Sequence, residues 1–282
     1  MQTAGLVASR PCVLRACSSN KASGASVRPL ATQPRPAVRF GRVEWSCRGP
    51  APAAAADSTK SEVAGTDRSI DVGRIAKYVG ATTVEVGVMT AALAAVQFAV
   101  SHPSSPLTAQ PWGTAFVFVF FFTMSIKSRV FSPLDARRPS ADGTGAVWEV
   151  KRPSWQPPPV VFPIVWSTIA VLRAASATMI WQANDALLCV PIMAFMLHLA
   201  IGDTWNHINN VELRKGGAAL GVLFVWASAA FATHMYAQTL PKAAYVLAPS
   251  LVWLAIAACL IWSIWDLNGR EELIPTTSKA TA

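Results

Sequence analysis

The sequence predicts an all-α protein, built as a polytopic bundle of membrane helices. Of its 282 residues, 52% are hydrophobic and 14% are charged, whereas soluble domains average about 25% charged residues. Apolar segments recur along the chain at close to the roughly 20 residues that a transmembrane helix needs. The expected spans are residues 78–100, 112–126, 158–181, 186–204, 218–236 and 243–267.

The first 50 residues have the composition of a targeting segment. They hold eight basic residues and one acid, and so carry +7 of the net charge of +9. They are rich in Ser and Ala and lack the continuous apolar stretch of a secretory signal, which predicts an organelle transit peptide. Chloroplast is favoured over mitochondrion because Ser, Ala and Pro break an amphipathic helix here; a disordered basic N-terminus is the alternative. Because the remainder is nearly neutral, no nucleic-acid partner is expected.

Composition divides the rest of the chain into four parts. Residues 51–73 change from an Ala/Pro run to polar and charged residues, which is typical of a linker. Residues 74–108 hold the first apolar segment, interrupted by Glu85, and predict an additional transmembrane helix. Residues 109–268 hold the other five segments and form the main membrane bundle, and residues 269–282 form a C-terminal tail.

Loop charges favour six crossings over five. The loop of residues 127–153 carries a net charge of +3. With six crossings it shares one side of the membrane with the basic residues before Tyr78, with Arg214 and with Arg270. The opposite loops carry little charge. Because Lys and Arg gather on one side of membrane proteins, six crossings fit the sequence better.

A proline-rich aromatic motif begins the third segment. Trp155-Gln156-Pro157-Pro158-Pro159 leads into the apolar stretch, and a second Trp follows at Trp166. Proline is tolerated in the first helical turn because its missing N–H would be unpaired there. Trp places one polar N–H on a large apolar body and suits the membrane interface. These residues indicate a rigid, aromatic-lined entrance to a transmembrane helix.

The pattern Trp-x-Pro-Pro-x-x-x-Phe-x-x-Val-Trp, from Trp155 to Trp166, resembles the signature of the TspO/MBR family (translocator protein and tryptophan-rich sensory protein). Trp205 stands where the third family helix ends. Pro249-x-x-x-Trp253, followed by Ile-Trp-x-Leu-Asn at residues 264–268, resembles the fifth. The resemblance covers about residues 110–268. It implies a five-helix bundle with a ligand pocket between the helices, to which residues 74–108 add a further helix, in a diverged plastid-type member.

The resemblance implies that this pocket binds porphyrins, haem-related tetrapyrroles or other flat apolar ligands. Trp253, Ala257 and Leu260 follow the i, i+4, i+7 spacing of one helix face, which leaves a slot for a flat ring. Arg173 lies near the middle of its segment, where a charge usually faces a cavity or a partner. Its expected partner is Glu85 or a ligand propionate. The expected ligand-contact residues are Trp155, Pro157, Pro158, Phe162, Trp166, Arg173, Trp205, Tyr236, Trp253, Ala257 and Leu260.

Polar residues gather at the end of the fourth segment. Those expected on one helix face are Asp203, Asn206, His207 and Asn210. They form either a polar lip for ligand carboxylates or a metal centre, or a solvated helix terminus. His198 and His234 lie inside apolar segments, and either could ligate haem iron. A hydrogen-bonded packing role is the alternative that we favour for both.

The sequence therefore predicts an integral membrane protein that binds a porphyrin, another tetrapyrrole or a lipid-like flat molecule, for sensing, sequestration or transport. Haem or protoporphyrin would be a ligand and not a required cofactor, and no metal site or catalytic residue is expected. Two alternatives stay open: a membrane enzyme that degrades porphyrin, and a helix-bundle transporter or scaffold. Small residues at 174–177 and 227–230 suit close helix contacts, in a homodimer or within one bundle.

Overall fold

The computed structural model describes residues 68–108, 111–135 and 150–278. All of them belong to the second of two units into which the chain divides, Glu62–Ala282. The expected transit peptide and most of the expected linker lie outside the described residues. The described elements are β1 (Arg68–Ile70), α1 (Val72–Ser101), η1 (Pro106–Thr108), α2 (Trp112–Lys127), η2 (Ser128–Phe131), α3 (Val161–Asn184), α4 (Val190–Asn210), α5 (Lys215–Thr239), α6 (Pro241–Leu247), α7 (Pro249–Leu267) and β2 (Thr276–Ser278).

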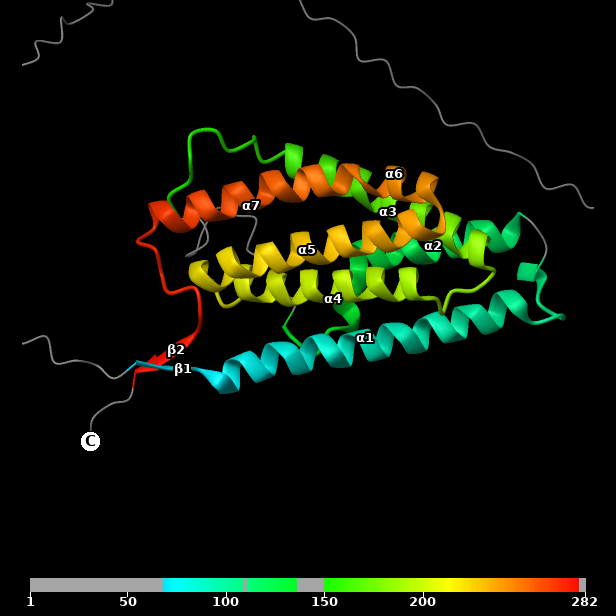
Figure 1. The fold of residues 1–282 in the computed structure, drawn as a ribbon, viewed down its shortest axis with the longest axis horizontal. Helices are drawn as coiled ribbons and strands as arrows, with labels where there is room; N and C mark the ends of the chain where they lie inside the picture. Colours follow the sequence, from blue (N-terminus) through cyan, green and yellow to red (C-terminus); the bar gives the residue numbers. More distant parts are fainter. Residues whose placement is uncertain (1–67, 109–110, 136–149, 279–282) are drawn as a thin grey trace, which may run out of the picture. The chain divides into compact units, whose positions relative to one another are not determined.

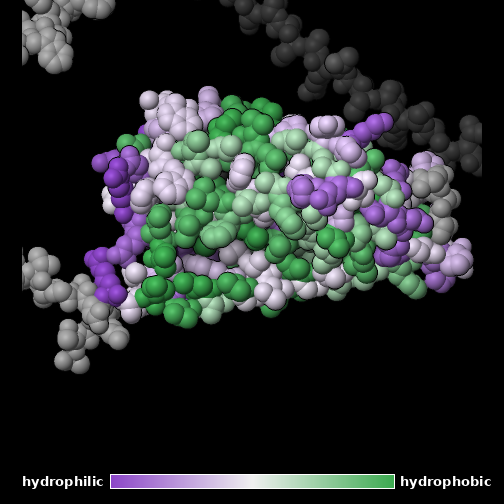
Figure 2. All heavy atoms as spheres, in the orientation of Figure 1, coloured by the Kyte–Doolittle hydropathy of each residue, from purple (hydrophilic) through white to green (hydrophobic). Residues whose placement is uncertain are grey.

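The long helices lie alongside one another, as Figure 1 shows. α1 packs against α4, α4 against α5, α5 against α7, and α2 against α3. In Figure 2, hydrophobic residues cover much of the middle of the bundle and hydrophilic residues gather towards its ends. Within the described residues, the spans long and apolar enough to cross a membrane are Val72–Ser101, Trp112–Phe131, Val161–Asn184, Lys215–Thr239 and Pro241–Leu267. The prediction of an all-α, polytopic membrane bundle is confirmed.

α4 was expected to be a membrane span, but it is not among the helices with this apolar composition. It packs between α1 and α5, but its residues from Gly202 onward are mostly polar. The helix was predicted to end at Thr204 and instead continues to Asn210. Its polar side chains bond within the helix: Asn206 Nδ2 donates to Gly202 O at 2.9 Å, and Asn210 Nδ2 donates to Asn206 Oδ1 at 3.2 Å. These bonds allow a polar end to stay helical inside the bundle.

Prolines shift two helix boundaries away from the prediction. α3 begins at Val161 rather than at Pro158, because the prolines of residues 157–159 have no N–H groups for a helical ladder. Val161 N instead donates to Pro158 O at 2.9 Å and closes a turn before the helix. The sixth predicted span is divided into α6 and α7 at Ala248. Pro249 follows immediately and cannot donate to the preceding turn.

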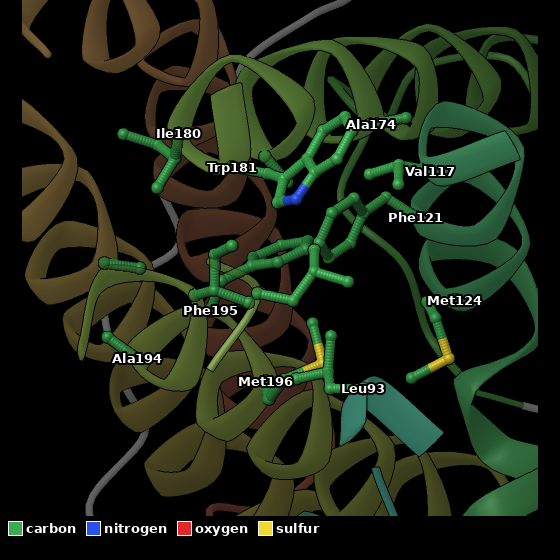
Figure 3. Close-up of a cluster of buried hydrophobic side chains, with 14 of the residues drawn as sticks. Leu93, Val117, Phe121, Met124, Ala174, Ile180, Trp181, Ala194, Phe195 and Met196 are labelled. Carbon is green, nitrogen blue, oxygen red and sulfur yellow. The ribbon is translucent and has the colours of Figure 1, made fainter. Parts of the chain in front are cut away.

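The main hydrophobic core joins α1 to the other helices. Figure 3 shows Trp181 of α3, Phe121 of α2 and Phe195 of α4 gathered with Leu93 of α1. The rings of Phe121 and Phe195 have centroids 6.5 Å apart. Lipid tails are as apolar as these side chains, so close packing holds membrane helices together better than burial alone. α1 is therefore an integral member of the bundle, as the additional helix was predicted to be.

A short sheet that was not predicted joins the start of α1 to the C-terminal segment. β1 pairs antiparallel with β2, and Ser69 lies opposite Thr277. These residues belong to the expected linker and tail. At the other end of α1, Gln97 Oε1 accepts a hydrogen bond from Leu187 N at 2.6 Å. α1 is thus held to the bundle at both ends.

Candidate ligand-binding site

A cavity of about 580 Å³ lies among α3, α4, α5 and α7, with the end of α2 and η2 completing its lining. It occupies the half of the bundle in which α3 begins and α4 and α7 end. Its volume falls within the range of about 300–1,000 Å³ that is usual for small-molecule pockets. The residues that line it come from segments far apart in the sequence.

An aromatic wall comes from α3 and α7. Phe162 and Trp166 lie one turn apart on α3. Trp253 of α7 meets Phe162 edge to face, with ring centroids 5.9 Å apart and planes at 69°. Ala257 and Leu260 follow Trp253 on the side of α7 that lines the cavity. Because Ala257 is small, the wall leaves space beside the indole ring.

Trp205 lines the cavity from α4 and is held in place by α5. Its Nε1 donates to Ala218 O at 3.0 Å. Gly221 makes room for the indole, since a Cβ at that position would lie 3.0 Å from Trp205 Cδ1. A backbone hydrogen bond and a glycine together orient this ring without any ligand.

A buried hydrogen-bonded chain borders the cavity. Arg173 Nη2 lies 2.7 Å from His198 Nε2, and His198 Nδ1 lies 3.0 Å from Ser228 Oγ. Ser228 Oγ donates its proton to Val225 O at 2.9 Å. Because Arg173 can only donate, His198 accepts at Nε2 and donates at Nδ1, and its imidazole is neutral. Both ring nitrogens are engaged, so His198 has a hydrogen-bonded packing role in this structure.

Two residues that line the cavity each carry a buried donor without a hydrogen-bond partner among the described residues. The donors are Arg173 Nε and Trp253 Nε1. Arg173 is only 7% exposed, and it bonds to His198 rather than to Glu85, one of the two partners expected from the sequence. Buried donors without acceptors are unfavourable, and a buried charge more so. An acceptor brought within reach of either donor would therefore be stabilised.

Seven of the predicted contact residues surround this cavity: Phe162, Trp166, Arg173, Trp205, Trp253, Ala257 and Leu260. The other four lie elsewhere. Tyr236 is fully buried in the hydrophobic core, where its ring packs against Phe195 at 6.4 Å. Its position along α5 places it about two turns beyond Ser228, deeper in the bundle than the cavity.

Trp155, Pro157 and Pro158 precede α3 and do not line the cavity. Their neighbours Gln156 and Pro159 line a second hollow of about 320 Å³. This hollow shares Phe162, Asn209, Asn210, Leu260 and Ile261 with the first cavity. The proline motif therefore borders the approach to the aromatic wall rather than the wall itself.

The polar end of α4 divides between two environments. Asp203, Asn206 and Asn210 line the cavity, together with Asn209, which the sequence did not single out. His207, expected on the same face, instead lies toward α1, with Nε2 3.4 Å from Lys77 Nζ. Its Nδ1 lies 3.0 Å from Asp135 O, and its Nε2 lies 3.2 Å from Glu212 Oε1. His234 was the second candidate haem ligand. Its Nε2 lies 3.0 Å from Nε2 of Gln238, one turn along α5, and it does not line the cavity.

Glu212 joins α4 to α1 outside the cavity. Lys77 Nζ donates to Glu212 Oε1 at 3.1 Å, and the Tyr78 hydroxyl donates to Oε2. Partial burial raises the pKa of Glu212, but the hydrogen bonds from Tyr78 and Lys77 outweigh it and hold the pKa below its usual value. This contact holds the first turns of α1 against the end of α4.

The end of α7 clamps the segment that precedes α3. Asn268 Oδ1 accepts from Lys151 N at 3.0 Å, and Asn268 Nδ2 donates to Lys151 O at 2.8 Å. Trp265 Nε1 donates to Glu271 O at 2.6 Å. Within the Ile-Trp-x-Leu-Asn motif, Asn268 thus holds the segment before α3, and Trp265 holds the C-terminal segment.

Comparison with known proteins agrees with this architecture. The model of the TspO/MBR family matches residues 114–266, which is the part of the chain from α2 to the end of α7. Protein CrtK of Rhodobacter capsulatus is 31% identical over 144 residues, which cover 48% of this chain and 89% of that protein. The translocator protein of Homo sapiens is 30% identical over 131 residues, covering 45% of this chain and 78% of that protein. The tryptophan-rich protein TspO of Chlorobaculum tepidum is 24% identical over 121 residues, covering 42% and 75%.

Proposed function

The chain belongs to the TspO/MBR family of membrane proteins, and we propose that its cavity binds a flat, largely apolar ligand with an acidic group, such as protoporphyrin, haem or a related tetrapyrrole. The role is sensing, sequestration or transport of that ligand. The observation that carries the proposal is the pairing of an aromatic wall with two buried donors, Arg173 Nε and Trp253 Nε1, that have no partner among the described residues.

The aromatic wall supports a flat ligand. Phe162, Trp166 and Trp253 present ring surfaces to the same space. Aromatic contacts of this kind contribute about 0.5–1.5 kcal/mol per pair beyond the burial of apolar area. Two or three such contacts favour a planar ring system over a flexible chain of equal size.

The Nε donor of Arg173, which has no partner among the described residues, supports an acidic group on the ligand. A carboxylate beside Arg173 would neutralise a buried charge and accept a hydrogen bond that the protein leaves unmade. A propionate of a tetrapyrrole has this chemistry. A purely apolar ligand would fill the slot and leave the Arg173 Nε donor without an acceptor.

The proposal also includes a plastid membrane and leaves a homodimer open. Residues 1–50 favour a plastid membrane, and they lie outside the described residues. Of the small residues that suit a homodimer, Ala174 and Ala177 are fully buried in the bundle and serve internal packing. Ala227 on α5 is exposed and remains open to a second copy.

Intrinsic fluorescence tests the proposal. Titration of the purified full chain with protoporphyrin should quench Trp emission saturably. Trp253→Phe keeps the aromatic body but removes Nε1, and it should weaken affinity about three- to tenfold, the effect of one hydrogen bond.

Trp226→Phe is the matched control. Trp226 is 41% exposed on α5 and its Nε1 donates to Leu251 O. It does not line the cavity, so its replacement should leave the dissociation constant unchanged. Absence of saturable quenching by protoporphyrin and by haem would remove the proposed function.

A further inference from the structure

The second hollow continues the cavity toward the segment that precedes α3. It has a volume of about 320 Å³. The side chains that line both hollows are Phe162, Asn209, Asn210, Leu260 and Ile261. The two spaces are therefore neighbours that share one layer of side chains. The aromatic wall and Arg173 account for the cavity, but they give this second space no part in binding.

The two hollows follow one another along the helices. On α5, Ala218 lines the second hollow, whereas Val222 and Val225 line the cavity. On α7, Trp253 lines the cavity and not the second hollow, and Ile264 lines the second hollow and not the cavity. The start of α5 and the end of α7 lie at the same end of the bundle. Both helices thus give the same order, and the combined space is elongated.

A cationic side chain lines each part of this elongated space. Arg173 lines the cavity at the level of His198, to which it bonds. Lys215 lines the second hollow together with Asn210. His198 and Asn210 are twelve positions apart on α4, which corresponds to about 18 Å along a helix. The two cations therefore lie at well-separated levels of the bundle.

The charged groups along the space leave each level open to an anion. Lys215 is partly buried, and its side chain has no hydrogen bond or ion pair with the described residues. Arg152 lines the second hollow as well, and none of the described acids lines it. Asp203 lines the cavity, and Arg129 Nε lies 3.8 Å from its Oδ1. An anionic group would meet a cation both at Arg173 and at Lys215.

We propose that the two hollows together hold one elongated, flat ligand with an acidic group at each end. One carboxylate binds Arg173, the planar body stacks on Phe162 and Trp253, and the other carboxylate binds Lys215. This rests on the proposed function, because it uses the same aromatic wall and the same guanidinium. It narrows the class of ligand, because both propionates of protoporphyrin leave one edge of the macrocycle and cannot reach both cations. A rigid conjugated polyene with two terminal carboxylates has the required shape.

Crocetin is a suitable probe, since it is a planar polyene with a carboxylate at each end. Titration of the purified full chain with crocetin should quench Trp emission saturably. Lys215→Met keeps the length of the side chain and removes its charge. It should weaken crocetin binding about three- to fivefold, the effect of a partly exposed ion pair, and leave protoporphyrin binding unchanged. Arg173→Met should weaken the binding of both ligands.

Lys242→Met is the matched control. Lys242 lies at the start of α6, as Lys215 lies at the start of α5. It lines neither hollow, so its replacement should leave the dissociation constants of both ligands unchanged.

Equal crocetin affinities of the parent and Lys215→Met would overturn the inference, as would absence of crocetin binding to a protein that binds protoporphyrin. In both cases the proposed function would stand. An equal loss of protoporphyrin affinity in Lys215→Met would also overturn it, because a ligand with both acids on one edge would then use Lys215. If neither crocetin nor a porphyrin quenched Trp emission saturably, the inference and the proposed function would fail together.

Discussion

Replacement of Arg173 by Met separates ligand binding from stability. Met has a similar length and no charge, so Arg173→Met should keep the packing of α3 while it removes the guanidinium from the cavity wall. Arg173 is 7% exposed and its hydrogen bond in the structure goes to His198 Nε2 at 2.7 Å. The change therefore acts on a small and well-defined set of contacts.

The effect on stability should be small because two terms oppose each other. Removal of a charged residue from mid-membrane depth relieves about 2.5–3.5 kcal/mol. The loss of the donor to His198 Nε2 leaves a buried acceptor without a partner, which costs about 1–3 kcal/mol. The free energy of unfolding should therefore stay within about 1–2 kcal/mol of the parent value.

The effect on binding should be large. A hydrogen bond to a charged group contributes about 1.5–3 kcal/mol, which corresponds to a change of about 10- to 150-fold in the dissociation constant. Protoporphyrin titrations by Trp quenching should show this loss, and the dimethyl ester should bind both proteins alike. Arg74→Met is the control, because Arg74 pairs with Asp71 at the outer end of α1. If folded Arg173→Met bound protoporphyrin as the parent does, the role of Arg173 as a ligand anchor would be refuted.

Two further predictions concern the end of the bundle where β1 and β2 lie. Gly216→Ala would place a Cβ 2.1 Å from Glu272 O and should lower the free energy of unfolding by about 1–3 kcal/mol, measured by thermal unfolding. Gly80→Ala is the control: its Cβ would meet open space, so the change should be neutral or stabilising. Equal shifts in melting temperature for both variants would contradict the predicted contact. Because the folded pKa of Glu212 is lowered, its contribution to stability is present above the unfolded pKa and is lost as pH falls through the folded pKa. Glu212→Gln should therefore lower the melting temperature at neutral pH and narrow the difference from the parent in acid, and a constant difference at both pH values would count against this linkage.

The helices could be predicted because their signal is local. Apolar length and the flanking charges place five of the six spans without any tertiary information. The ends of the helices were harder to predict from the sequence. α3 begins three residues later than predicted since three prolines withhold their N–H groups. α4 runs past Thr204 because side chains of its own polar end bond back within the helix.

Part of the cavity lining follows from helical periodicity. Trp253, Ala257 and Leu260 share one face by their spacing, and the cavity lies on that face. Tyr236, expected from the family resemblance, and His207, expected from helical spacing, do not line the cavity. Periodicity gives the direction of a side chain relative to its own helix, but not which neighbour occupies that direction. Tyr236 packs against Phe195, and the ring nitrogens of His207 contact Asp135 O and Glu212 Oε1.

The sequence by itself determined a membrane bundle of the TspO/MBR type with an additional N-terminal helix, since hydropathy, proline positions and Trp spacing are properties of short segments. Only the tertiary structure decided that Arg173 bonds to His198 and that Thr82 of α1 lies beside Thr204 of α4, 122 positions later in the chain. Such pairings depend on which helix faces pack together. That choice depends on the volumes and shapes of many side chains at once, and no local pattern records it.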